Sequence, residues 1–160
     1  MSRLSIFKTM LLAAGILGAA GFWPVRAEEQ RTPRRVERVI DGDTVVLDGG
    51  EHVRLLGINA PEYEPWKHYA QPYGKESAAC AGKWMAGKKV LLEYDTERKD
   101  KYGRTLAYVY SENGDFINRE LVTKGCAKAR YYAPNGRYYK ILKEAEKTAK
   151  ADHKGLWGGL

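Results

Sequence analysis

The segment "RLLGINAPE" places an arginine, Arg54, in a strand-like apolar run and ends on the carboxylate of Glu62. A guanidinium group among apolar residues is costly to bury unless an anion lies close to it. Glu62 or a nearby aspartate would neutralise Arg54 as part of the fold, whereas the phosphate of a bound ligand would do so as part of a reaction. The residues alone leave these alternatives open.

Further charged residues occur in two turns. Asp41 and Asp43 lie in "VIDGDTV", and Arg104 ends "DKYGR". Each has an ordinary structural explanation, because aspartate and glycine favour turns and most arginines are solvated at the surface. Taken together, carboxylates and guanidinium groups are also the groups that bind a hard metal ion and hold a phosphate.

The N-terminal segment has the organisation of a secretory signal peptide. Arg3 and Lys8 precede an apolar stretch of small and branched residues, and Ala27 ends a small-residue cleavage site. We therefore expect residues 1–27 to be removed on export and the protein to be secreted or periplasmic.

The remaining chain has the length of one domain. We expect residues 28–35 to form a flexible lead-in and residues 36–160 to form the folded domain. Loss of the signal peptide removes three of the 27 basic residues and none of the 20 acidic ones, so the net charge falls from +7 to +4. This mild excess favours a polyanionic partner but does not prove one.

Cys80 and Cys126 are the only cysteines. Export to an oxidising compartment would favour a disulfide between them, and two buried free thiols are the alternative. Their spacing does not decide between the two.

The pattern of apolar residues predicts an α+β fold in which five short strands build a small antiparallel barrel. The strands are expected near residues 35–40, 44–48, 52–58, 88–95 and 104–117. Residues 59–74 are rich in proline and aromatic residues and are expected to form a long functional loop. Helices are expected at residues 75–87, 118–125 and 137–155. The stripe expected on the last helix consists of Ile141, Leu142, Ala145, Thr148 and Ala149.

The order "VIDGDTV", "VRLLGINAPE" and "DKYGRTLAYVY" closely resembles the staphylococcal-nuclease-like (thermonuclease) family. The resemblance extends from about Val36 to Trp157, and three motifs in the same order make it specific. It implies a five-stranded OB-fold β-barrel with three helices. It also implies a nuclease that hydrolyses DNA and RNA with one Ca²⁺ and leaves 3′-phosphate and 5′-hydroxyl ends.

The resemblance also implies roles for individual residues. Arg54 and Arg104 would hold the scissile phosphate, and Glu62 would be the general base for the attacking water. The Ca²⁺ ligands would be the side chains of Asp43 and Asn59 and the backbone carbonyl of Ala60.

Asn59 departs from the family pattern, because the family commonly has an aspartate there. An amide oxygen still coordinates Ca²⁺, but the site loses one negative charge, so we expect weaker metal binding. This departure is the best sequence argument for a rival interpretation, a non-catalytic OB-fold module that only binds nucleic acid.

Basic and aromatic residues lie close together in "DKYGR" and "ARYYAPNGRYY". Aromatic rings among positive charges suit single-stranded or frayed nucleic acid, because every base has a face that can stack. The resemblance implies that Lys101, Tyr102 and Tyr131 contact the terminal phosphate or base of the substrate. We expect a monomer without stable membrane association after cleavage.

Overall fold

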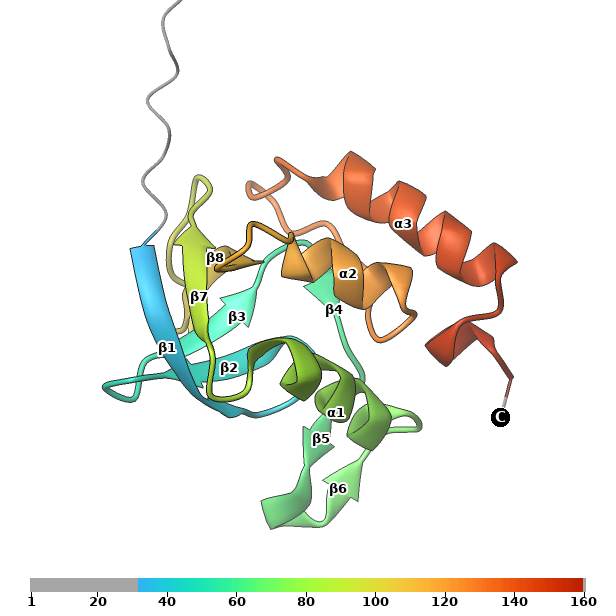
Figure 1. The fold of residues 1–160 in the computed structure, drawn as a ribbon, viewed down its shortest axis with the longest axis horizontal. Helices are drawn as coiled ribbons and strands as arrows, with labels where there is room; N and C mark the ends of the chain where they lie inside the picture. The colour runs from blue at the N-terminus through green and yellow to red at the C-terminus, as the bar shows by residue number, and fades with distance from the viewer. Residues whose placement is uncertain (1–31, 160) are drawn as a thin grey trace, which may run out of the picture.

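The computed structural model describes residues 32–159, in which five strands form a closed barrel (Figure 1). The α+β class and the five-stranded barrel are thereby confirmed. The predicted signal peptide, residues 1–27, lies outside the described residues. In order around the barrel, the strands are β1 (Thr32–Val39), β2 (Thr44–Leu47), β3 (His52–Leu55), β8 (Thr105–Ser111) and β7 (Lys89–Glu93).

One pair of barrel strands is parallel, which corrects the expectation of a fully antiparallel barrel. β3 pairs with β8 in parallel, with Val53 opposite Thr105, and the other four pairs are antiparallel. The odd number of strands requires this exception, because strand directions can alternate all the way around a closed ring only when the number of strands is even.

The first strand begins earlier than the sequence pattern indicated. β1 starts at Thr32 and therefore includes residues 32–35, which we had assigned to the lead-in. These residues pair with β7, and the second half of β1 pairs with β2 after a register shift between Val36 and Arg38. Pro33 is tolerated because only one neighbouring strand pairs with this half of β1.

Three α-helices pack on the barrel, as expected: α1 (Gly74–Met85), α2 (Ile117–Thr123) and α3 (Tyr139–Ala151) (Figure 1). A short 3-10 helix, η2 (Gly155–Trp157), follows α3. The core between barrel and helices consists of fully buried apolar side chains, among them Val45, Leu55, Met85, Leu121 and Leu142. Within residues 32–159, no helix has both the length and the apolar character needed to cross a membrane.

Four short strands outside the barrel join segments that are distant in sequence. β4 (Ile58–Asn59) pairs with β9 (Lys128–Ala129). β5 (Tyr63–Glu64) and β6 (Tyr69–Ala70) form a hairpin around the 3-10 helix η1 (Pro65–Lys67), where we had expected an irregular loop. Strands of two residues are too short to show an alternating pattern in the sequence, which explains why the hairpin was not anticipated.

The two cysteines form a disulfide and are not free thiols. The bridge connects Cys80 in α1 to Cys126, which follows α2, across 46 positions of sequence. Cys126 lies just before β9, and the disulfide therefore ties α1 to the segment that pairs with β4.

The buried side of α3 differs from the predicted apolar stripe, because Ile141 and Thr148 of that stripe are exposed and the charged Glu146 is buried. Ile141 is 48% exposed, whereas Glu146 is only 4% exposed. The Glu146 carboxylate accepts hydrogen bonds from the backbone N–H of Ala129 (3.2 Å) and from the ammonium groups of Lys143 (2.5 Å) and Lys150 (3.4 Å). Glu146 thereby attaches α3 to β9.

The contacts of Glu146 predict a pH dependence of stability. Burial raises the pKa of Glu146, but the lysine contacts outweigh burial and leave the pKa below its ordinary value. Such a group stabilises the fold above its unfolded pKa and loses this contribution as the pH falls through its folded pKa. We expect Glu146→Gln to lower the free energy of unfolding at pH 7, and this deficit to shrink below a pH of about 4.3.

Urea unfolding of wild type and variant between pH 7 and pH 3 measures this difference. A deficit that stays constant over the whole range would show that the carboxylate charge does not stabilise the fold.

Candidate active site

Most of the predicted site residues line one cavity of about 510 Å³ at the edge of the barrel. The cavity is bordered by the ends of β2 and β3, by the segment that follows β4, and by the turn between β7 and β8. Those of the predicted residues that line it are Asp43, Arg54, Asn59, Glu62, Lys101, Tyr102 and Arg104. Asp43 and Arg104, which are 61 positions apart in the sequence, therefore line the same cavity.

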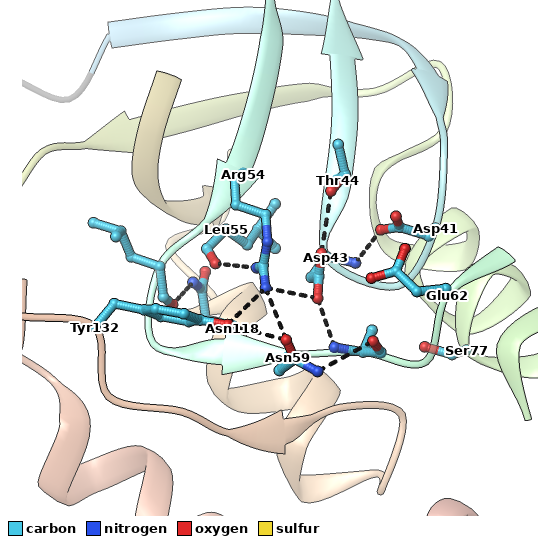
Figure 2. Close-up of polar contacts among 12 residues, drawn as sticks. Asp41, Asp43, Thr44, Arg54, Leu55, Asn59, Glu62, Ser77, Asn118 and Tyr132 are labelled. Atoms are coloured by element: carbon cyan, nitrogen blue, oxygen red, sulfur yellow. Dashed lines mark hydrogen bonds and ion pairs between the residues drawn. The ribbon is translucent and has the colours of Figure 1, made fainter. Parts of the chain in front are cut away.

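In the free protein, Arg54 forms an ion pair with an aspartate of the fold, Asp43. Its Nη2 lies 3.1 Å from Oδ2 of Asp43, and the two side chains are only 11% and 7% exposed (Figure 2). The barrel register brings them together, because Arg54 pairs with Thr44 and Asp43 immediately precedes Thr44. A second guanidinium nitrogen, Nη1, donates to the backbone carbonyl of Leu55 at 2.7 Å.

Asp43 is held by further hydrogen bonds in addition to the ion pair. Its Oδ2 accepts the backbone N–H of Ala60 at 2.5 Å, and its Oδ1 accepts the hydroxyl of Thr44 at 3.1 Å. Burial raises the pKa of Asp43 above its ordinary value; the charge of Arg54 opposes this rise, and the negative charge of Asp41 adds to it. The side chain of Asp43 is therefore fixed in position, and its charged form is less favourable than that of an exposed aspartate.

Asn59 connects Arg54 to an aromatic residue that the sequence analysis did not select. Its Oδ1 accepts hydrogen bonds from Nη2 of Arg54 (3.3 Å) and from the hydroxyl of Tyr132 (3.0 Å) (Figure 2). Its Nδ2 donates to the carbonyl of Ala60 at 3.4 Å, so the predicted ligand atom of Ala60 is close to Asn59 but does not line the cavity.

Tyr132 lines the cavity, whereas the predicted substrate contact Tyr131 lies outside it. The guanidinium carbon of Arg54 lies 5.7 Å from the centre of the Tyr132 ring. Tyr131 instead lies against Tyr139, with ring centres 5.4 Å apart, and does not line the cavity. Adjacent residues of an extended segment point to opposite sides, and the motif "RYY" does not show which tyrosine faces inward.

Glu62 is positioned through its backbone by Gln71, another residue that the sequence analysis missed. The Glu62 N–H donates to Oε1 of Gln71 at 3.0 Å, and the Gln71 N–H donates to the Glu62 carbonyl at 2.9 Å. Gly74 packs against the same carbonyl so closely that a Cβ atom there would lie 2.3 Å from the oxygen. These contacts leave the carboxylate beside Asp41 and Asp43 (Figure 2). Burial raises the pKa of Glu62, and the charge of Asp41 adds to the rise.

Arg104 is oriented by Asp100, which organises the turn of the third motif. Oδ2 of Asp100 accepts Nε of Arg104 at 2.7 Å, and its Oδ1 accepts the backbone N–H groups of Tyr102 (2.9 Å) and Arg104 (3.0 Å). Tyr102 is 73% exposed, and the Lys101 ammonium lies 5.0 Å from the centre of its ring. The outer rim of the cavity is therefore positive and aromatic.

The oxygen donors of the cavity suit a calcium ion in part. Among residues 32–159, no three histidine, cysteine, aspartate or glutamate side chains are arranged as a metal site. Asp41, Asp43 and Glu62 nevertheless line one cavity, and Asp41 raises the pKa of both other carboxyl groups. A cation relieves such repulsion, and Ca²⁺ prefers carboxylate oxygens. Asn59 fits less well, because its Oδ1 already accepts two hydrogen bonds.

Comparisons with known proteins identify relatives of this chain. A family model described as staphylococcal nuclease homologue matches residues 52–159. The thermonuclease of Staphylococcus intermedius is 42% identical over 125 residues, which cover 76% of this chain and 74% of that protein. The thermonuclease of Staphylococcus hyicus is 39% identical over 126 residues, covering 77% and 74%. Endonuclease YncB of Bacillus subtilis (strain 168) is 36% identical over 127 residues, covering 76% and 60%.

The role of Gln71 predicts a local change in the Gln71→Ala variant. The Glu62 N–H would lose its side-chain acceptor, and a hydrogen bond of this kind contributes about 1 kcal/mol. We expect the Glu62 amide to exchange with solvent about fivefold faster in nuclear magnetic resonance measurements. Gln71→Glu keeps an oxygen acceptor at the same position and is the matched control. Equal exchange rates in wild type and Gln71→Ala would remove Gln71 from the positioning of Glu62.

Proposed function

The chain belongs to the staphylococcal nuclease homologue family, and we propose that it is a calcium-dependent nuclease that acts on both DNA and RNA. That it is a nuclease, an enzyme that hydrolyses phosphodiester bonds, follows from its thermonuclease and endonuclease relatives. The observation that carries the finer proposal is the convergence of two arginines with the carboxylates of Asp41, Asp43 and Glu62 on one cavity.

The two arginines have the chemistry that a phosphodiester requires. The substrate is already an anion, and its negative charge concentrates further on the phosphoryl oxygens as water adds to phosphorus. Guanidinium groups bind such oxygens in a bidentate manner and have no proton to lose at neutral pH. We propose that Arg54 and Arg104 hold the scissile phosphate from two sides. Asp43 and Asp100 orient these arginines in the free protein.

Glu62 is the proposed general base. Its carboxylate lies at the cavity beside Asp41 and Asp43 (Figure 2), and we propose that it takes a proton from the water molecule that attacks a phosphate held by Arg54. Burial raises the pKa of Glu62, which makes its carboxylate a stronger base than that of an exposed glutamate. The hydrogen bonds to Gln71 fix the backbone from which it acts.

The proposed calcium ligands are Asp43, Asn59 and the carbonyl of Ala60. When bound there, Ca²⁺ would supply a Lewis acid for a phosphoryl oxygen and for the attacking water. Asn59 must release at least one of its two hydrogen bonds to offer its amide oxygen to a cation, because both lone pairs of that oxygen are engaged. We therefore expect modest calcium affinity.

The remaining parts of the proposal concern products and setting. We propose that cleavage of the P–O5′ bond leaves 3′-phosphate and 5′-hydroxyl ends. Lys101, Tyr102 and Tyr132 are the proposed contacts to neighbouring phosphates and bases, and all three line the cavity. Removal of residues 1–27 would release a monomer outside the cytoplasmic membrane, and the disulfide suits an oxidising compartment.

A second candidate function is binding of nucleic acid without cleavage. The engaged amide oxygen of Asn59 favours it, because a site that does not bind its metal would retain only the affinity of the arginines and aromatic rings. Binding of an oligonucleotide that stays intact at millimolar Ca²⁺ would decide for this alternative.

The proposed mechanism predicts how the purified chain acts on heat-denatured DNA. We expect degradation with added Ca²⁺ and none in excess EGTA. Glu62→Gln should lower the turnover number by roughly 10²–10⁴-fold without unfolding the chain, as is usual for the loss of a general base. Glu112→Gln removes the same charge from an exposed turn and should leave turnover unchanged. Full turnover in EGTA, or in Glu62→Gln, would contradict the mechanism.

The state of Asn59 predicts that Asn59→Asp binds Ca²⁺ more tightly. The substitution adds a negative charge beside Asp43, and an added charge a few ångströms from a divalent ion contributes about 1 kcal/mol or more, or roughly fivefold in affinity. Calorimetric titration of the protein without nucleic acid measures the affinity. Asn113→Asp makes the same charge change in the exposed turn after β8 and serves as the control. Equal affinity of Asn59→Asp and wild type would exclude residue 59 as a calcium ligand.

A further inference from the structure

The β5–β6 hairpin, residues 63–70, carries large aromatic side chains on an ordered frame. Glu64 pairs with Tyr69 across the two strands, and the Lys67 ammonium lies 2.8 Å from the Glu64 carboxylate. The His68 N–H donates to the carbonyl of Pro65 at 3.2 Å and closes the turn. The hairpin projects away from the barrel beneath α1 (Figure 1).

Two of these side chains, Trp66 and Tyr69, are exposed. Trp66 is 57% exposed and Tyr69 is 47% exposed, and neither lines the cavity. The backbone that carries them is held by the pairing of β5 with β6 and by the hydrogen bond from the Gln71 N–H to the Glu62 carbonyl. Their backbone positions are therefore fixed before any ligand binds. Exposed rings on an ordered frame lose little conformational freedom when they bind a flat partner.

The hairpin is continuous with the cavity on one side. Glu62, the proposed general base, immediately precedes β5, and its N–H donates to the side chain of Gln71, which immediately follows β6. Figure 2 shows Glu62 on the opposite side of Asp43 from Tyr132. A strand of nucleic acid that meets Tyr132 at one end of the cavity and passes Arg54 and Glu62 therefore leaves the cavity toward the hairpin.

We propose that the hairpin, through Trp66 and Tyr69, is a stacking platform for bases of single-stranded nucleic acid beyond the cavity on the Glu62 side. This inference rests on the proposed function for its substrate class. Stacking requires unpaired bases, because both faces of a base in a duplex are covered by its neighbours. The platform therefore favours single-stranded over double-stranded substrate.

The charges of the hairpin support stacking over phosphate binding as its mode of contact. Its one lysine, Lys67, is already paired with Glu64. A contact made mainly by rings displaces few counterions, so its contribution to affinity depends little on salt. The arginines and Lys101 of the cavity supply the salt-dependent part of binding.

The test uses a single-stranded decanucleotide and a dinucleotide as substrates of wild type and of the double variant Trp66→Ala/Tyr69→Ala, in Ca²⁺. We expect the variant to raise KM for the decanucleotide about fivefold or more, as the loss of a stacked base does, with kcat unchanged. KM for the dinucleotide, which is too short to reach the hairpin, should not change. The increase in KM for the decanucleotide should persist at high salt.

Two control variants separate stacking from general perturbation. Trp66→Phe/Tyr69→Phe keeps both rings and should retain the wild-type KM. Ile141→Ala truncates a side chain of similar exposure on α3 and should have no effect.

Each contrary result is informative. An unchanged KM for the decanucleotide in Trp66→Ala/Tyr69→Ala, or an equal rise for the dinucleotide, would overturn the platform while leaving the nuclease proposal intact. If wild type binds the decanucleotide without cleaving it, the nuclease mechanism fails. The platform is then tested by the Kd for the decanucleotide, measured by fluorescence anisotropy in the same buffer and compared between wild type and Trp66→Ala/Tyr69→Ala. Wild type that neither binds nor cleaves would overturn both.

Discussion

The nearly buried ion pair between Arg54 and Asp43 is the interaction on which the site depends. Barrel pairing of β2 with β3 sets the two residues side by side, and the N–H of Leu55 donates to the Asp43 carbonyl at 2.8 Å. Loss of one partner would leave a buried charge uncompensated, which typically costs about 3–5 kcal/mol. The same pair keeps the guanidinium group at the cavity. In the proposed mechanism, a cation would take the place of Arg54 as the partner of Asp43, and a phosphate would take the place of Asp43 as the partner of Arg54.

The surrounding fold holds this pair in place through buried polar contacts at the points where elements meet. Asn118 of α2 accepts the N–H of Val109 at 2.9 Å and donates to the carbonyl of Leu56 at 2.7 Å, which joins the helix to β8 and to the turn that follows β3. Glu146 joins α3 to β9, and β9 pairs with the strand that carries Asn59. The barrel alone therefore does not build the cavity. The helices fix the two segments that carry Asn59 and Tyr132.

Much of the fold could be predicted from the pattern of apolar residues, and much of the site from three motifs in a specific order. Arg54 in an apolar strand required an anion, and the family resemblance of the three motifs marked Asp43 and Arg104. Contacts that depend on tertiary geometry could not be predicted. Nothing in "RYY" distinguishes Tyr132 from Tyr131, and Gln71 has no motif because it acts through the backbone of Glu62. The parallel pairing of β3 and β8 follows from closure of a five-stranded ring, which the period of individual strands does not encode.

The most direct test of the account is the pKa of Asp43, measured by nuclear magnetic resonance of its carboxyl carbon in metal-free wild type and in Arg54→Met. Burial and Asp41 raise this pKa, and the charge of Arg54 restrains the rise. The account predicts a further increase when a neutral side chain of similar length replaces the guanidinium group. An unchanged or lower pKa in Arg54→Met would show that the two side chains do not form the pair around which the site is built.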